Sequence, residues 1–142
     1  MRRIERVIVD TSALVALVRE WEFAHDSCLT TLGQVRVPLL TCWPVLTEAA
    51  WLLRYDWGGV ESIATMVEGG VLTLVALDEE ALHWIIASMA QYASIGAQMA
   101  DAALMWIAEK EGIETIFTLD RRDFSVYRTS DGRALRIVPE WS

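Results

Sequence analysis

Residues 7–14 read VIVDTSAL, in which three β-branched residues run into an acid and then into two hydroxyls. A short apolar run of this kind predicts a buried strand over Val7–Val9. Asp10 would then follow the carboxyl end of that strand, where open α/β sheets bind their ligands. The segment from Ser12 to Glu20 has apolar side chains at helical spacing and predicts a helix. This part of the chain therefore favours a strand, an acid at the sheet edge and a helix.

The remaining sequence alternates between the same two patterns. Strands are expected at residues 35–41, 71–77, 115–119 and 134–138. Helices are expected at residues 21–32, 44–57, 60–68 and 99–111. Asp78 is expected to cap a further helix that follows it. Gly33 and the pair Gly58-Gly59 are expected to end the helices that precede them. The alternation predicts a three-layer α/β/α sandwich around a central, mostly parallel sheet of about five strands. We expect a single domain over residues 1–142.

The composition is apolar for a chain of this size. Of the 142 residues, 54% are hydrophobic, and the mean hydropathy is +0.30. Either the core is unusually complete, or one face is buried against another subunit. The aromatic side chains of Trp51, Trp57, Trp84 and Trp106 are expected to serve the core or such an interface rather than to stack on bases.

The chain carries no features of a secreted or membrane protein. No apolar run approaches the ~18 residues that a membrane span requires. The first six residues, MRRIER, are basic but lead into a strand, unlike a signal peptide. Cys28 and Cys42 are too few for a disulfide scaffold or a zinc knuckle, and we expect both to be reduced core residues. The expected location is the cytoplasm.

The net charge of −8 argues against a protein that grips nucleic acid through bulk electrostatics. It does not exclude a nuclease with a metal site, because carboxylate ligands themselves add negative charge. Five arginines gather near the C-terminus, namely Arg121, Arg122, Arg128, Arg133 and Arg136. They form either a local phosphate contact or a solvated surface paired with acids.

Three acids stand alone in uncharged sequence. Asp10, Glu48 and Asp101 are each the only charged residue in their stretches, residues 7–18, 37–53 and 84–108 respectively. Because charge is costly in a core, such an acid caps a helix, pairs with a distant base or binds a cation. A helix cap is an open alternative for Asp10 and Asp101. Glu48 resists that explanation, since it lies about one turn inside its predicted helix.

A fourth acid, Asp120, follows the strand predicted at 115–119, although it could also simply begin a turn. Two of the four acids thus lie at strand ends and two near helix starts, so all four are expected at one sheet edge. Clustered carboxylates repel one another unless a positive charge neutralises them. A hard divalent cation, Mg²⁺ or Mn²⁺, fits such oxygen ligands. His25 and His83 lack ligand spacing, which argues against zinc.

At this point the sequence resembles a known family. The ordered segments VDTSAL (9–14), TE (47–48), ADAAL (100–104) and TLDRRDF (118–124) resemble a PIN domain. They are similar in particular to the VapC-like ribonucleases of bacterial and archaeal toxin–antitoxin pairs. The resemblance covers essentially the whole chain, and the closing segment is its most specific part. It implies an endonuclease that depends on Mg²⁺ or Mn²⁺ and usually cuts RNA.

The resemblance also implies roles for individual residues and partners. The catalytic and metal-binding acids would be Asp10, Glu48, Asp101 and Asp120, with Glu48 shared or bound through water. The supporting residues would be Thr11, Ser12, Thr118 and Asp123, and Arg121 and Arg122 would contact RNA. Local caps or turn bonds remain the alternative for the three hydroxyls. The family further implies a homodimer and an antitoxin that covers the groove with a basic side chain among the acids.

Without a histidine placed as a base, the metal would have to activate the water, and the products would be a 5′-phosphate and a 3′-hydroxyl. Three other functions stay open. A phosphoryl-transfer domain would use Asp10 as a nucleophile, but it needs an acid where Ser12 stands. A PIN-like module without catalysis would bind nucleic acid only. A PIN nuclease outside any toxin pair would act in RNA processing or on DNA.

Overall fold

The computed structural model describes residues 2–140. Its strands are β1 (Val7–Val9), β2 (Leu39–Thr41), β3 (Leu72–Leu74), β4 (Thr115–Phe117) and β5 (Arg136–Val138). Its α-helices are α1 (Thr11–Val18), α2 (His25–Gln34), α3 (Trp43–Leu52), α4 (Trp57–Glu68), α5 (Glu79–Gln91), α6 (Met99–Glu111) and α7 (Arg121–Phe124). A short 3-10 turn, η1 (Ala93–Ile95), lies between α5 and α6.

The five strands form one sheet in the order β3-β2-β1-β4-β5. Every neighbouring pair is parallel, and Ile8 at the centre pairs with Leu40 on one side and Ile116 on the other. The chain leaves β1 toward β2 and β3, and later returns to place β4 on the opposite side of β1. The strand order therefore reverses between β1 and β4, and such a switch point is where open α/β sheets bind ligands.

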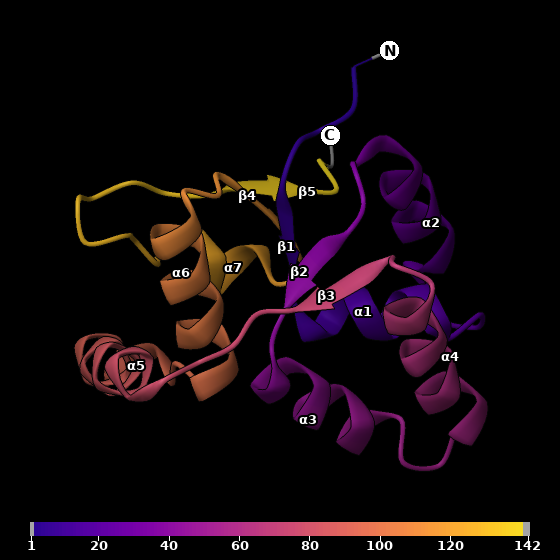
Figure 1. Ribbon diagram of the computed structural model, residues 1–142, viewed down its shortest axis with the longest axis horizontal. Helices are drawn as coiled ribbons and strands as arrows, with labels where there is room; N and C mark the ends of the chain where they lie inside the picture. Colours follow the sequence, from indigo (N-terminus) through magenta and orange to yellow (C-terminus); the bar gives the residue numbers. More distant parts are fainter. Residues whose placement is uncertain (1, 141–142) are drawn as a thin grey trace.

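The helices cover both faces of this sheet. Figure 1 shows α5, α6 and α7 on one side of the strands and α1, α2 and α4 on the other. All three residues of β1 are fully buried, as are Ile116 and Phe117 of β4. Helix α6 is buried almost continuously from Ala100 to Ala108, because it packs between the sheet and α5. The predicted three-layer α/β/α sandwich with a parallel five-stranded sheet is confirmed.

Several predicted element boundaries are wrong. The helix expected at 44–57 ends earlier, since α3 stops at Leu52, and the helix expected at 60–68 begins earlier, since α4 starts at Trp57. The side chain of Asp56 accepts a hydrogen bond from the Gly59 N–H at 3.1 Å and so caps α4. The glycine pair therefore lies in the first turn of a helix instead of ending one.

The helix expected at 21–32 is also shifted, since α2 occupies His25–Gln34 and contains Gly33. Arg19 adopts an extended backbone and ends α1, and a turn leads from there into α2. The strands expected at 35–41 and 71–77 shrink to their central residues, Leu39–Thr41 and Leu72–Leu74. The helix expected at 99–111 is confirmed at both ends, with Gly112 in the left-handed conformation after it.

The tryptophan side chains divide between the core and the surface. Trp106 is buried, whereas Trp51 and Trp57 are 64% and 69% exposed. The core role is thus wrong for these two side chains, and the interface role stays a prediction. Cys28 and Cys42 are both buried and unpaired, which confirms the expectation of reduced core residues. Within residues 2–140, no helix combines the length and the apolarity that crossing a membrane requires.

Candidate active site

Asp10 lies at the point where the strand order reverses. It directly follows β1, and its backbone N–H donates to the carbonyl of Phe117 at the end of β4 at 2.9 Å. The side chain is only 5% exposed. Although Asp10 occupies the N-cap position of α1, its carboxylate makes no capping hydrogen bond. The side chain turns toward β4 instead of capping α1, although the Thr11 backbone N–H still lowers the pKa of the carboxyl.

The Asp10 carboxylate is held by hydroxyl groups from both strand ends. Thr118, directly after β4, donates to Asp10 Oδ2 at 2.8 Å. The Oγ of Ser12 lies 3.2 Å from the Thr118 hydroxyl and 3.5 Å from Asp10 Oδ2. Backbone N–H groups of Leu119 and Asp120 donate to these two hydroxyls and fix them in place. The two hydroxyls thus join the β1 and β4 ends around one carboxylate oxygen.

Burial dominates the electrostatics of Asp10. It raises the pKa of this carboxyl to about 7, against the opposing effect of the Thr118 hydrogen bond. The charges of Asp101 and Glu48 raise the pKa further, so both of these acids lie near Asp10. A carboxylate in this setting is costly to ionise without a nearby positive charge.

Glu48 and Asp101 belong to helices that pack against each other, α3 and α6. Burial, followed by the charge of Asp101, raises the pKa of Glu48. Burial also raises the pKa of Asp101, and the charges of Asp120 and Asp123 add to it. The structure thereby brings all five predicted acids into one electrostatically coupled group.

Asp101 and Asp120 belong to this acidic group, and each also accepts a hydrogen bond that caps a helix. Asp101 Oδ2 accepts a hydrogen bond from the Gln98 N–H at 3.3 Å, so the cap alternative is correct for that oxygen. Asp120 Oδ1 accepts from the Asp123 N–H at 3.1 Å and caps α7. Asp123 is half-buried, and burial and the charge of Asp120 raise its pKa.

The donor set fits a hard divalent cation in its chemistry. Asp10, Asp101 and Asp120 each accept the hydrogen bonds described above through a single carboxylate oxygen. The second oxygen of each carboxylate takes part in none of these bonds. None of the ion pairs within the described chain includes any of the five acids. The hydroxyl of Thr11 is buried and makes no hydrogen bond of ordinary geometry within residues 2–140, although it lies near enough to Glu48 to lower the pKa of that carboxyl. Oxygen ligands and uncompensated negative charge are what Mg²⁺ and Mn²⁺ require.

The group is not a preformed metal site. Across residues 2–140, no three acidic, histidine or cysteine side chains are close enough to hold an ion as they stand. The side chains would have to draw together around a cation. His25 binds the Ala16 carbonyl through Nδ1 and His83 is exposed, so neither joins the acids.

The predicted RNA-contacting arginines differ in their surroundings. Arg121 donates from its guanidinium to the carbonyl of Pro139 at 2.8 Å. Arg122 is exposed beside Asp123, whose pKa its charge lowers. One residue at the site was missed from the sequence. Tyr127 donates its hydroxyl to Asp101 Oδ2 at 3.0 Å, and nothing in its local pattern sets it apart from a core aromatic.

A family model for the PIN domain matches residues 7–129 of this chain. The chain belongs to the PIN domain family. The matched range contains all four acids that were expected to bind metal, from Asp10 to Asp120. The family resemblance seen in the sequence is therefore confirmed.

Individual relatives agree with this assignment. The PIN domain is similar to Ribonuclease VapC26 of Mycobacterium tuberculosis, with 27% identity over 135 residues that cover 94% of this chain and 100% of that protein. Its structure is similar to the crystal structure of VapC20 of the same organism, described as a sarcin-ricin loop cleaving toxin, with a TM-score of 0.74 at 18% identity. That match covers 82% of this chain and 91% of VapC20, and it shows the PIN fold.

The Thr118 hydroxyl offers a direct test of how Asp10 is held. Thr118→Val keeps the shape but removes the donor to Asp10 and the acceptor for the Asp120 N–H. If Asp10 binds a metal, we expect RNA cleavage to fall by about 10- to 100-fold, the usual cost of losing a residue that orients a metal ligand. Thr31→Val is the matched control, since Thr31 is equally buried but bonds only within α2. Equal activity of the two variants would contradict this role for Thr118.

Proposed function

We propose that this PIN domain is a divalent-metal-dependent endoribonuclease that hydrolyses phosphodiester bonds. The observation that carries the proposal is Asp10, a buried carboxyl at the sheet's switch point that is coupled to Asp101 and Glu48 with no base paired to it. The activity named for VapC26 supports the same chemistry. The substrate is RNA in this proposal, and the location is the cytoplasm.

The acids of the chain would hold the ion in two ways, directly or through water. Asp10, Asp101 and Asp120 each have one oxygen outside the hydrogen bonds described above and would bind Mg²⁺ or Mn²⁺, with Glu48 shared or bound through water. When bound, such an ion lowers the pKa of water and offsets charge on the scissile phosphate. Thr118 and Ser12 orient Asp10, and Asp123 holds Asp120 through its backbone.

The substrate's phosphates need a positive charge near this acidic group. Arg122 is exposed and close to Asp123, so it is the better placed of the two arginines to steer an RNA backbone. Arg121 is already engaged by the Pro139 carbonyl and would serve mainly to fix the C-terminal segment. No histidine adjoins the acids in the described chain, so the residues themselves supply no neutral general base.

The ends of the RNA products test this function. Incubation of the purified chain with a single-stranded RNA and Mg²⁺ should give 5′-phosphate and 3′-hydroxyl ends, and EDTA should stop the reaction. A histidine-based ribonuclease would instead leave cyclic phosphate ends and ignore EDTA. Full activity in EDTA, or cyclic ends, would therefore overturn the proposal. Cleavage of DNA in preference to RNA would mean that the proposed substrate is wrong and that the enzyme is a deoxyribonuclease.

We also propose that the chain is the toxin of a toxin–antitoxin pair and acts as a homodimer. The description of VapC20 as a toxin supports the first part. The exposed side chains of Trp51 and Trp57 are available for contact with a partner. Expression should arrest growth, and co-expression of a small protein encoded just upstream should relieve it. Growth arrest that persists with that protein would favour a PIN nuclease that works outside such a pair.

A further inference from the structure

Tyr127 is a buried residue between α7 and β5 that bonds directly to a proposed metal ligand. Its side chain is 2% exposed, and its hydroxyl donates to Asp101 Oδ2 at 3.0 Å. The ring packs edge-on against Tyr92 and Phe124, with both centroid separations 5.1 Å. The two neighbouring rings thus fix the position of the Tyr127 ring, and its hydroxyl has little freedom to leave Asp101.

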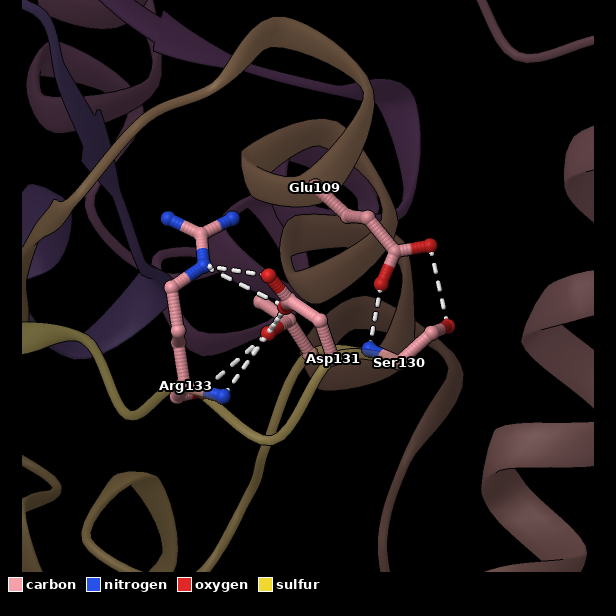
Figure 2. Close-up of polar contacts among 5 residues, drawn as sticks. Glu109, Ser130, Asp131 and Arg133 are labelled. Atoms are coloured by element: carbon pink, nitrogen blue, oxygen red, sulfur yellow. Dashed lines mark hydrogen bonds and ion pairs between the residues drawn. The ribbon is translucent and has the colours of Figure 1, made fainter.

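The segment that carries Tyr127 is tied to the same helix as Asp101. Figure 2 shows Ser130 beside Glu109 of α6, where the glutamate accepts from both the Ser130 N–H and its hydroxyl, the latter at 3.0 Å. Figure 2 also shows Arg133 turned back onto Asp131, whose carboxylate accepts from Arg133 Nε at 3.0 Å. The loop is therefore closed on itself and fastened to α6.

Two further hydrogen bonds tie this loop to Trp84 of α5 and to Tyr92, which directly follows that helix. The indole N–H of Trp84 donates to the Ser130 hydroxyl at 3.3 Å, and the Arg128 N–H donates to the Tyr92 hydroxyl at 3.1 Å. Asp101 and Glu109 are eight residues apart, so the loop holds α6 at two places about 12 Å apart along its axis. The segment 127–133 thus forms a strap across α6, with Tyr127 at the end that meets the acids.

We infer that Tyr127 is a positioning residue for the Asp101 carboxylate. Its hydroxyl and the Gln98 N–H both bind Oδ2, and together they fix the rotation of the carboxylate so that Oδ1 is the oxygen left for a cation. This inference rests on the proposed function, because it assigns Asp101 to the metal. Donors that orient a metal ligand typically account for 10- to 100-fold in metal affinity.

The alternative is that the hydrogen bond to Asp101 only offsets the cost of burying the Tyr127 hydroxyl and does nothing for the carboxylate. A buried phenol usually finds a hydrogen-bond partner, whatever that partner does. The two explanations differ in what removal of the hydroxyl changes. A satisfied core tyrosine would alter the free energy of unfolding, by about 1 kcal/mol for one hydrogen bond. A positioning residue would alter the affinity for the cation.

The test is a calorimetric titration of Mn²⁺ into the full chain. Tyr127→Phe keeps both ring contacts and removes only the hydroxyl, and we expect it to weaken Mn²⁺ binding by about 10-fold or more. Tyr92→Phe is the matched control, because it removes a nearby hydroxyl that contacts the strap but no acid. Its Mn²⁺ affinity should equal that of the unmodified chain. Raising the Mn²⁺ concentration should restore RNA cleavage by Tyr127→Phe.

The outcomes separate this inference from the proposed function. If the unmodified chain binds Mn²⁺ and Asp101→Asn weakens binding while Tyr127→Phe does not, the role of Tyr127 is overturned and the metal site stands. If Tyr127→Phe and Tyr92→Phe weaken binding equally, the effect belongs to the strap and the inference is also overturned. If the unmodified chain binds no Mn²⁺, the proposed function fails, and the role of Tyr127 fails with it.

Discussion

Asp10→Asn should abolish metal-dependent RNA cleavage, with a loss of more than about 100-fold, because even residues that only orient a ligand cost 10- to 100-fold. Asparagine preserves the side-chain shape and can still accept the Thr118 hydrogen bond. It removes the charge that a cation needs. The rate of cleavage of a single-stranded RNA at saturating Mg²⁺ measures the loss.

A second acid supplies the control. Asp78 caps α5 through the Ala81 N–H at 2.9 Å and lies outside the coupled group. Asp78→Asn removes one negative charge as well, yet it should leave cleavage unchanged. Circular dichroism should show the same fold for both variants. Near-normal cleavage by folded Asp10→Asn would remove Asp10 from the site.

The metal-free protein should lose stability as the pH rises through 7. Burial raises the pKa of Asp10 from 3.8 to about 7, so the unfolded chain releases this proton at lower pH than the folded chain does. The stability from the protonated carboxyl is complete below the unfolded pKa, declines between the two values and is lost above pH 7. A three-unit shift corresponds to about 4 kcal/mol at most. The raised pKa values of Glu48 and Asp101 act in the same direction.

Denaturant unfolding in EDTA at pH 5.5 and pH 8 measures this loss. The unmodified chain should be less stable at pH 8, and Asp10→Asn should show a smaller difference between the two pH values. Mn²⁺ at pH 8 should restore stability to the unmodified chain, because it binds the ionised carboxylates of the folded state. A pH dependence that Asp10→Asn leaves intact would mean that another group causes it.

In the sequence, the isolation of the acids is what pointed to the candidate site. Asp10 and Asp101 stand alone in uncharged stretches, and the alternation of strands and helices implied a common sheet edge for them. The structure places both in one coupled group, with Asp10 at the switch point between β1 and β4. The order of the strands could not be predicted, because it depends on which crossovers the chain makes. The position of Asp10 beside β4 emerged only from that order.

Sequence patterns gave wrong predictions at positions where contacts between distant parts of the chain determine the structure. Gly58-Gly59 indicated a helix end, but the Asp56 side chain makes it a helix start. The apolar run at 71–77 predicted a long strand, yet the strand spans only Leu72–Leu74, with one further hydrogen bond at each of Val71 and Val75, because its single neighbour β2 is itself only three residues long. Tyr127 carries no signal in sequence because its bond to Asp101 joins residues 26 apart.

The central claim is that Asp10, Glu48, Asp101 and Asp120 jointly bind the cation on which RNA cleavage depends. Calorimetric titration with Mn²⁺ tests it most directly, on the unmodified chain and on Asp10→Asn, Glu48→Gln, Asp101→Asn, Asp120→Asn and the control Asp78→Asn. The unmodified chain and Asp78→Asn should bind Mn²⁺ equally, and each of the other variants should bind it at least about 10-fold more weakly. No binding by the unmodified chain, or equal binding by all six proteins, would contradict the claim.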